Sequence, residues 1–209
     1  MTVQEKWAGE AAASHYAGAR FASARAAGRD PRLVRRLLAR HAPDAARVLD
    51  APCGSGRLAA ALSPGARRVH LDANLPMLEA ARAAVGDGAR VAGSLFALPF
   101  ASQSFDAVVS CRFLHHLHAQ AELERAVEQL VRVTRDLVVA SFWDAASLPG
   151  WRVRRGLKRD EGPRGRVFRT RDELRDAFAK AGAPVVEFVP VLRFVTQQTF
   201  LVARREGAR

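Results

Sequence analysis

The stretch VLDAPCGSGR, residues 48–57, decides the fold of this chain of 209 residues. It opens with the apolar residues of a buried strand, ends on two glycines, and runs into the helix-forming residues of RLAAAL, 57–62. Because glycine has no Cβ, Gly54 and Gly56 let a ligand approach the backbone, and a helix that begins there offers unpaired N–H groups. The stretch therefore predicts a ligand-binding turn between a strand and a helix.

The rest of the chain repeats this alternation of short apolar runs and helical stretches. Strands that are apolar throughout and separated by helices predict a parallel sheet covered on both faces. Too few residues separate the last two runs, 184–195 and 198–205, for a crossover helix, so we expect an antiparallel pair at the sheet edge. The prediction is a doubly wound α/β sheet of seven mostly parallel strands, the first five at 46–51, 67–73, 89–94, 105–111 and 136–143, with helices at 57–62, 75–85, 121–133 and 171–182.

Two acidic residues near the glycines distinguish two classes of ligand. GSGRLA matches the G-x-G-x-x-G/A pattern of dinucleotide-binding turns, and Asp72 lies 18 residues after Gly54, where an acid that binds a ribose is expected. Asp50 stands at the strand end ahead of the glycines, where its charge would repel a pyrophosphate and favour an amino group or a sulfonium. The alternative is that the glycines only form a turn and that Asp72 is a solvated acid.

The motifs around this turn resemble those of the class I S-adenosylmethionine-dependent methyltransferases, in the broad group that acts on small molecules. The first motif of that family is similar to VLDAPCGSGR, its ribose-binding acid to Asp72 in VHLDAN, and its third and fourth motifs to GSLFALPFASQSFDAVVSC, residues 93–111. The resemblance implies a Rossmann-like fold and S-adenosylmethionine as the cofactor. It places Ser94 and Leu95 by the adenine, and implies cofactor contacts for Asp50, Cys53, Gly54, Gly56, Asp72, Ala73, Ser94, Leu95 and Ser110.

Two residues depart from the family pattern. Pro52 stands where most members have the first glycine, and Ser94 stands where an Asp commonly accepts from the adenine amino group. Proline can occupy a turn and a Ser hydroxyl still accepts a hydrogen bond, so both departures bear on affinity more than on the family. Cys53 follows Pro52 as the nucleophile of cytosine C5 methylation does, but it lies in the cofactor turn and is interpreted as a packing residue.

The methyl acceptor is indicated mainly by motifs that the sequence lacks. It has no Asn/Asp-Pro-Pro-aromatic sequence after the fourth strand, no Lys-Asp-Lys-Glu tetrad, and no paired acids for magnesium after the fifth strand. We therefore expect a small or medium-sized acceptor, methylated on a hydroxyl or carboxyl oxygen. His115 and His116 follow the fourth strand, where an imidazole could take the proton from a hydroxyl. The alternative is that they pack and cap the next helix, with His118 in its first turn.

A basic segment follows the fifth strand, beside the expected crevice. From Trp151 to Arg171 it carries nine basic residues against Asp160 and Glu161, which is +7 of the net charge of +12. Its Gly-Pro-x-Gly sequence favours a mobile loop. We expect a lid over the acceptor whose arginines, Arg164 and Arg166 among them, select an anionic group. The alternatives are contact with a nucleic-acid backbone and a solvated face.

Two helices are expected ahead of the sheet. Thr2 and Glu5 form a capping-box pattern that predicts a helix over 2–28, and Pro31 is expected to begin the next helix. The family resemblance implies that such N-terminal helices close over the cofactor. Alternatively, the helix only lies on the domain through two apolar contacts, Tyr16 and Phe21.

Composition places the chain among globular proteins, with 49% hydrophobic and 26% charged residues. We expect residues 1–43 to form an N-terminal helical extension or lid and 44–209 the methyltransferase domain, with 144–170 as a variable substrate-side insertion. Two cysteines are too few for a disulfide framework or a four-thiolate metal site, and no apolar run is long enough to span a membrane. A cytoplasmic protein with reduced cysteines and no metal is therefore expected.

Three functions stay open at this point, and the oligomeric state is not indicated by any pattern. The first is S-adenosylmethionine-dependent methylation of a small molecule, which the arginines extend to anionic acceptors. The second is methylation of RNA or another polyanion, which the net charge favours and the low aromatic content, 7%, disfavours. The third is a subunit that binds S-adenosylmethionine without catalysis.

Overall fold

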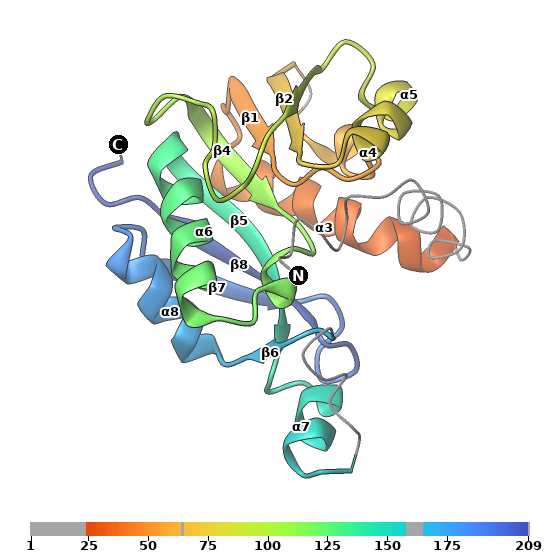
Figure 1. Cartoon of the computed structure of the whole chain (residues 1–209), viewed down its shortest axis with the longest axis vertical. Coiled ribbons are helices and arrows are strands. Elements are labelled where there is room, and N and C mark those ends of the chain that lie inside the picture. Colours follow the sequence, from red (N-terminus) through yellow and green to blue (C-terminus); the bar gives the residue numbers. More distant parts are fainter. Residues whose placement is uncertain (1–23, 64, 158–164, 209) are drawn as a thin grey trace.

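The fold is built on one mixed sheet with the strand order β3-β2-β1-β4-β5-β8-β7 (Figure 1). The computed structural model describes residues 24–63, 65–157 and 165–208. The first five strands pair in parallel, whereas β8 is antiparallel to both β5 and β7. The strands are β1 (Arg47–Asp50), β2 (Arg67–Asp72), β3 (Ala89–Ala92), β4 (Phe105–Ser110), β5 (Thr134–Asp144), β7 (Val185–Pro190) and β8 (Gln198–Arg204).

These strands confirm the predicted doubly wound α/β sheet with an antiparallel final pair. A further two-residue strand, β6 (Phe168–Arg169), pairs in parallel with the end of β5. The apolar run expected as a strand over 184–195 pairs only as far as Pro190. Phe194 has a φ of +64°, which belongs to a turn, so residues 191–196 form the loop that leads to β8.

Helices cover both faces of the sheet (Figure 1). On one face, α6 (Gln120–Val133) and α8 (Arg171–Lys180) bury apolar side chains that include Leu130 and Phe178. On the other face lies α3 (Ala24–His41). The shorter elements are the 3-10 turns η1 (Ala59–Ala61) and η2 (Leu114–His116) and the helices α4 (Leu75–Ala80), α5 (Arg82–Val85) and α7 (Leu148–Arg154).

Helix α3, the described part of the predicted N-terminal extension, shares its core with the sheet. Leu38 lies in one apolar cluster with Val48 of β1 and Val202 of β8. Pro31 lies inside this helix, so the prediction that it begins a helix was wrong. Proline removes one backbone hydrogen bond from a helix, but the ion pairs of the neighbouring Asp30 hold this turn against the sheet. The residues Thr2, Glu5, Tyr16 and Phe21 lie outside the described part of the chain.

The helix expected over 57–62 is reduced to the single 3-10 turn η1. Gly56 still belongs to the preceding turn, with a φ of +77°, and β2 already begins at Arg67. The sequence Ser-Pro-Gly at 63–65 disfavours any longer helix between these points. A 3-10 turn, and not the N-terminus of an α-helix, therefore follows the glycine turn.

Candidate functional site

The glycine turn connects the carboxyl end of β1 to η1, at the edge where open α/β sheets bind ligands. Gly54 has a φ of +55°, and a Cβ added to it would meet no atom within 4 Å. At Gly56 a Cβ would lie 3.1 Å from the Cβ of Ala84 and 3.2 Å from that of Ala81. Gly54 therefore leaves room for a ligand over the turn, whereas Gly56 allows close packing against the α4–α5 region.

Asp72, at the carboxyl end of β2, fixes the glycine turn in place. Its carboxylate accepts the backbone N–H of Gly54 at 2.8 Å and that of Asn74 at 2.9 Å. Burial raises the pKa of Asp72, although these backbone hydrogen bonds oppose the rise. An ionised carboxylate offers about four lone-pair sites, so two bonds leave acceptor capacity for hydroxyl groups of a ligand.

Asp50 lies at the end of β1, ahead of the turn, and is fully buried. Its Oδ2 is 3.4 Å from Nδ1 of His70, its register partner in β2. Burial raises the pKa of Asp50, and the hydrogen bond with His70 opposes the rise. Among the described residues, no hydrogen-bond partner reaches Oδ1 of Asp50. The Asp50 side chain does not reach the surface, so the structure shows no position where it would touch a ligand. The attraction between Asp50 and a cationic ligand group stays a prediction.

Four further residues of the predicted cofactor set follow the ends of neighbouring strands. Ala73 follows β2 and is exposed, whereas Leu95 follows β3 and is buried. Ser94 is half-buried, and its Oγ accepts the N–H of Phe96 at 3.2 Å. Ser110 ends β4 and is fully buried, with no hydrogen-bond partner for its Oγ in the described ranges. Because parallel strands end at one edge, these residues share that edge with the glycine turn.

Both cysteines are buried beside this edge as free thiols. Burial raises the pKa of Cys53, and its backbone N–H donates to the carbonyl oxygen of Leu71 at 2.8 Å. Burial also raises the pKa of Cys111, to about 11. A thiol with a raised pKa is a poor nucleophile, which supports the interpretation of Cys53 as a packing residue.

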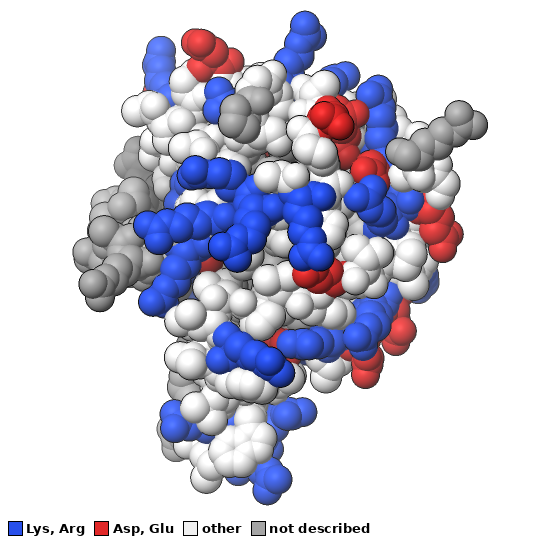
Figure 2. Space-filling view, turned by 180° about the vertical axis from the view of Figure 1, so that it is seen from behind, with Lys and Arg blue, Asp and Glu red and all other residues white. Residues whose placement is uncertain are grey.

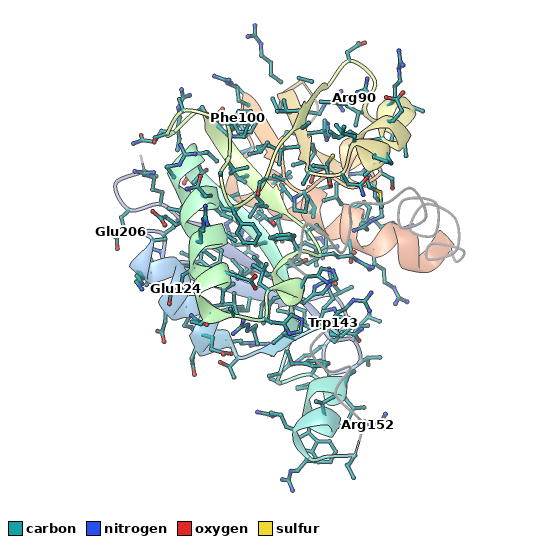
Figure 3. All side chains as sticks on the ribbon, in the orientation of Figure 1. Arg90, Phe100, Glu124, Trp143, Arg152 and Glu206 are labelled. Carbon is teal, nitrogen blue, oxygen red and sulfur yellow. The ribbon has the colours of Figure 1, made fainter. Side chains whose placement is uncertain are left out.

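His115 and His116 lie in η2, directly after β4. Their side chains are 3% and 7% exposed. The His115 ring stacks on Trp143 of β5 with the centroids 5.0 Å apart, and lies 4.4 Å from the His116 ring (Figure 3, where Trp143 is labelled). His118, expected in the first turn of a helix, precedes α6 instead, and its Nε2 lies 3.1 Å from the carbonyl oxygen of Gly165.

Two arginines of the basic segment are structural. Arg169 is 5% exposed and donates to the carbonyl oxygens of Leu117 at 2.7 Å and His118 at 3.0 Å. Arg171 forms an ion pair of 2.9 Å with the buried Asp144 at the end of β5. For these two residues the expectation of acceptor binding is wrong, because their guanidinium groups hold the η2 loop and α8 against the sheet.

Arg166 is the arginine of this segment that lies beside the predicted bases. Its guanidinium carbon is 5.0 Å from the ring centroid of Trp143, the same residue on which His115 stacks. The part of the predicted lid at 158–164, which includes Arg164, lies outside the described residues.

A buried polar cluster that our sequence analysis missed connects α3 to the glycine turn. Asp30, 2% exposed, pairs with Arg57 at 3.1 Å and with Arg112 at 2.8 Å. Arg57 also donates to Sγ of Cys111 at 3.3 Å. A sequence signal did exist, since Asp30 is the one acidic residue within Ala24–His41, a helix otherwise rich in arginine.

Residues 49–139 match the family described as the methyltransferase domain. Over these residues the chain is similar to methyltransferase domains. The chain is 40% identical over 104 residues to a protein of Encephalitozoon cuniculi named as a methyltransferase, a match that covers 50% of this chain and 47% of the relative. It is 33% identical over 124 residues to the demethylmenaquinone methyltransferase of Thermobifida fusca, and this match covers 53% of this chain and 51% of the relative.

Solved structures show the same fold as this chain. The magnesium protoporphyrin IX methyltransferase of Synechocystis PCC 6803, crystallised with bound S-adenosylhomocysteine, superposes with a TM-score of 0.71 at 18% identity and covers 87% of this chain and 85% of that one. The chain spans about half the length of the curated relatives that it matches. Within its described part, no helix has the length and apolar content needed to cross a bilayer.

Proposed function

We propose that the chain binds S-adenosylmethionine over the glycine turn and transfers its methyl group to a small or medium-sized acceptor. The observation that carries the proposal is the pairing of open space over Gly54 with the carboxylate of Asp72, which holds the N–H of that same residue at 2.8 Å. Asp72 would accept the ribose hydroxyls, Ser94 and Leu95 would contact the adenine, and Ser110 would lie by the methionine part.

Bound S-adenosylmethionine supplies a methyl group on a sulfonium, whose departure leaves a neutral thioether. The chain then has to hold an acceptor oxygen in line and exclude water, which positioning by packed side chains can supply. The η2 loop is suited to this task because Arg169 fixes two of its neighbouring carbonyl oxygens and Trp143 packs against His115.

We propose His116 as the group that takes the proton from a hydroxyl acceptor. The His115 ring stacks on Trp143 and contacts the His116 ring at a tilt of 44°, which suits a packing role. His116 is the more exposed of the two, at 7% against 3%. A neutral imidazole at this position would act as a general base, with the other histidine setting its orientation.

An anionic group on the acceptor would be bound by Arg166. This guanidinium lies over Trp143, the residue on which His115 also stacks, and a guanidinium binds a carboxylate or phosphate through its edge donors. Replacing Arg166 by Gln should raise the Michaelis constant for an anionic acceptor without changing the affinity for S-adenosylhomocysteine.

The proposed function is tested by incubating the chain with S-adenosylmethionine and pools of hydroxyl- and carboxyl-bearing acceptors, and measuring release of S-adenosylhomocysteine. We expect acceptor-dependent release that is lost in Asp72→Ala. Binding of S-adenosylmethionine with no turnover in any pool would support the non-catalytic alternative.

A second candidate, methylation of RNA, is favoured by the exposed side of α3. Four exposed arginines recur there every three or four residues, opposite the buried Leu38; these arginines are Arg29, Arg32, Arg36 and Arg40. Figure 2 shows a band of basic side chains across the middle of this face. Arg40 pairs with Glu187 at 3.2 Å. Like charges at this spacing disfavour a helix by about 0.2–0.5 kcal/mol per pair, so a polyanion that neutralises the other three arginines would be stabilising.

Filter binding with RNA at several salt concentrations separates the two candidates. If RNA is the acceptor, replacing Arg32 and Arg36 by Gln should reduce the slope of log affinity against log salt by about one per lost phosphate contact. If the acceptor is a small molecule, methyl transfer will not respond to these replacements.

A further inference from the structure

Most of the large apolar side chains that are exposed lie in one region of the molecule. Of the eight that are exposed in the described ranges, six belong to two segments, residues 148–157 around α7 and residues 191–196 between β7 and β8. We call these two segments the tip surface. Its exposed apolar residues are Leu148 at 43%, Trp151 at 40%, Leu157 at 67%, Leu192 at 37%, Phe194 at 64% and Val195 at 65%.

The two segments of the tip surface are in direct contact. The backbone N–H of Leu148 donates to the carbonyl oxygen of Phe194 at 3.1 Å. Figure 1 shows α7 projecting beyond the end of the sheet at which β5 stops, so the tip surface lies at the edge that also carries the glycine turn and η2.

Helix α7 is held in this projecting position. A Cβ on Gly150 would lie 2.8 Å from backbone atoms of Asp144 and Ala145, so the start of the helix sits directly on the end of β5. Ser147 caps the helix by accepting the N–H of Gly150 and donates to the carbonyl oxygen of Asp144 at 2.6 Å. The exposed apolar side chains of α7 therefore project into solvent from a helix that is packed firmly on the end of β5.

The tip surface is also strongly basic. It carries four arginines and no acidic residue, and Figure 2 shows blue side chains bordering white atoms on the lowest part of the molecule. Over the residues that the structure covers, no carboxylate pairs with these arginines. Two of them pack over aromatic rings of the same surface, Arg155 at 5.5 Å from Trp151 and Arg193 at 4.9 Å from Phe194; the other two are Arg152 and Arg154.

We infer that the tip surface binds the surface of an anionic lipid bilayer. Exposed Trp, Phe and Leu side chains beside arginines match the boundary between headgroups and acyl chains, where apolar groups leave water and guanidinium groups meet phosphates. An apolar patch of this kind is otherwise costly to leave in water. The inference is independent of the methyl-transfer proposal, since it rests on no residue of the cofactor site.

Two other occupants fit the tip surface less well. A second copy of the chain docking symmetrically would place four arginines against four arginines, and an isologous interface has no way to neutralise them. RNA would need several aromatic faces for stacking, but the tip surface has only two aromatic rings, Trp151 and Phe194, each already in contact with a guanidinium group, and its other four exposed apolar side chains are aliphatic.

Cosedimentation of the full chain with lipid vesicles tests the inference. We expect binding to vesicles of phosphatidylcholine mixed with phosphatidylglycerol, weaker binding to phosphatidylcholine alone, and a decrease with added salt. Phe194→Ser should lower the partition coefficient about tenfold, and Arg154→Gln about fivefold.

Matched variants on other faces serve as controls. Leu75 on α4 is 64% exposed, as Phe194 is, and Arg36 on α3 is exposed, so Leu75→Ser and Arg36→Gln should leave vesicle binding unchanged. All four variants change exposed side chains, and circular dichroism will verify that they fold. The inference is overturned if the native chain ignores anionic vesicles, if the control variants lose as much binding as the tip variants, or if the tip variants change only self-association or RNA binding.

Discussion

Asp72→Asn tests whether the carboxylate of Asp72 binds a ligand or only shapes the glycine turn. In the structure it accepts two backbone N–H groups, from Gly54 at 2.8 Å and Asn74 at 2.9 Å. A hydrogen bond to a charged group contributes about 1.5–3 kcal/mol, and Asn retains one acceptor oxygen, so we expect the free energy of unfolding to fall by about 1–3 kcal/mol. Loss of the charged acceptor for the ribose hydroxyls should cost about 1.5–3 kcal/mol of binding, or about 10- to 100-fold in affinity for S-adenosylhomocysteine.

Asp106 provides a matched control at the opposite end of the sheet. It lies near the start of β4, and its Oδ2 accepts the backbone N–H groups of Ala46 at 2.9 Å and Arg47 at 2.8 Å. Asp106→Asn should therefore lower the free energy of unfolding as Asp72→Asn does, while leaving ligand affinity unchanged. Urea unfolding and calorimetric titration of both variants separate the two effects. The reasoning is refuted if Asp72→Asn binds as tightly as the native chain, or if both variants lose affinity equally.

Four further outcomes follow from the site. Asp30→Asn leaves two arginines without their shared carboxylate and should lower the free energy of unfolding by about 2–4 kcal/mol in urea titrations; an unchanged midpoint would contradict this. Because the pKa of Cys111 is raised to about 11 and Cys53 is also buried with a raised pKa, both thiols should resist iodoacetamide in the native chain and react after unfolding, as mass spectrometry would show. Burial raises the pKa of Asp50, so the native chain holds this proton more tightly than the unfolded chain, and the free energy of unfolding should decrease as pH rises from 3.8 through the raised pKa; Asp50→Asn should flatten that decrease. His116→Ala should reduce turnover of a hydroxyl acceptor about 100-fold with cofactor affinity retained, whereas lost stability with full turnover would show a packing role.

The sequence predicted the parts of this fold that depend on local pattern. Apolar runs separated by helical stretches identify the parallel strands, and the short gap before Gln198 identifies the antiparallel pair. The turn at Gly54 was located because glycine is required where φ is positive and a ligand approaches the backbone. These features are each encoded within a few neighbouring residues.

The features that the sequence did not predict depend on contacts between distant segments. Asp30 meets Arg112 across 82 positions of the chain; its place as the one acidic residue of its helix marks Asp30 itself, but no local pattern identifies Arg112 as the partner. Arg169 looks like its basic neighbours in the sequence, but its burial under the η2 loop makes it structural. Gly56 satisfies the ligand-turn pattern, yet its missing Cβ makes room for Ala81 and Ala84.

The central claim is that the site over the glycine turn binds S-adenosylmethionine and not a dinucleotide. Calorimetric titration of the native chain with S-adenosylhomocysteine, and in parallel with NAD, tests it most directly. The claim predicts saturable binding of one S-adenosylhomocysteine per chain and no heat of binding for NAD. Binding of NAD without binding of S-adenosylhomocysteine would contradict it.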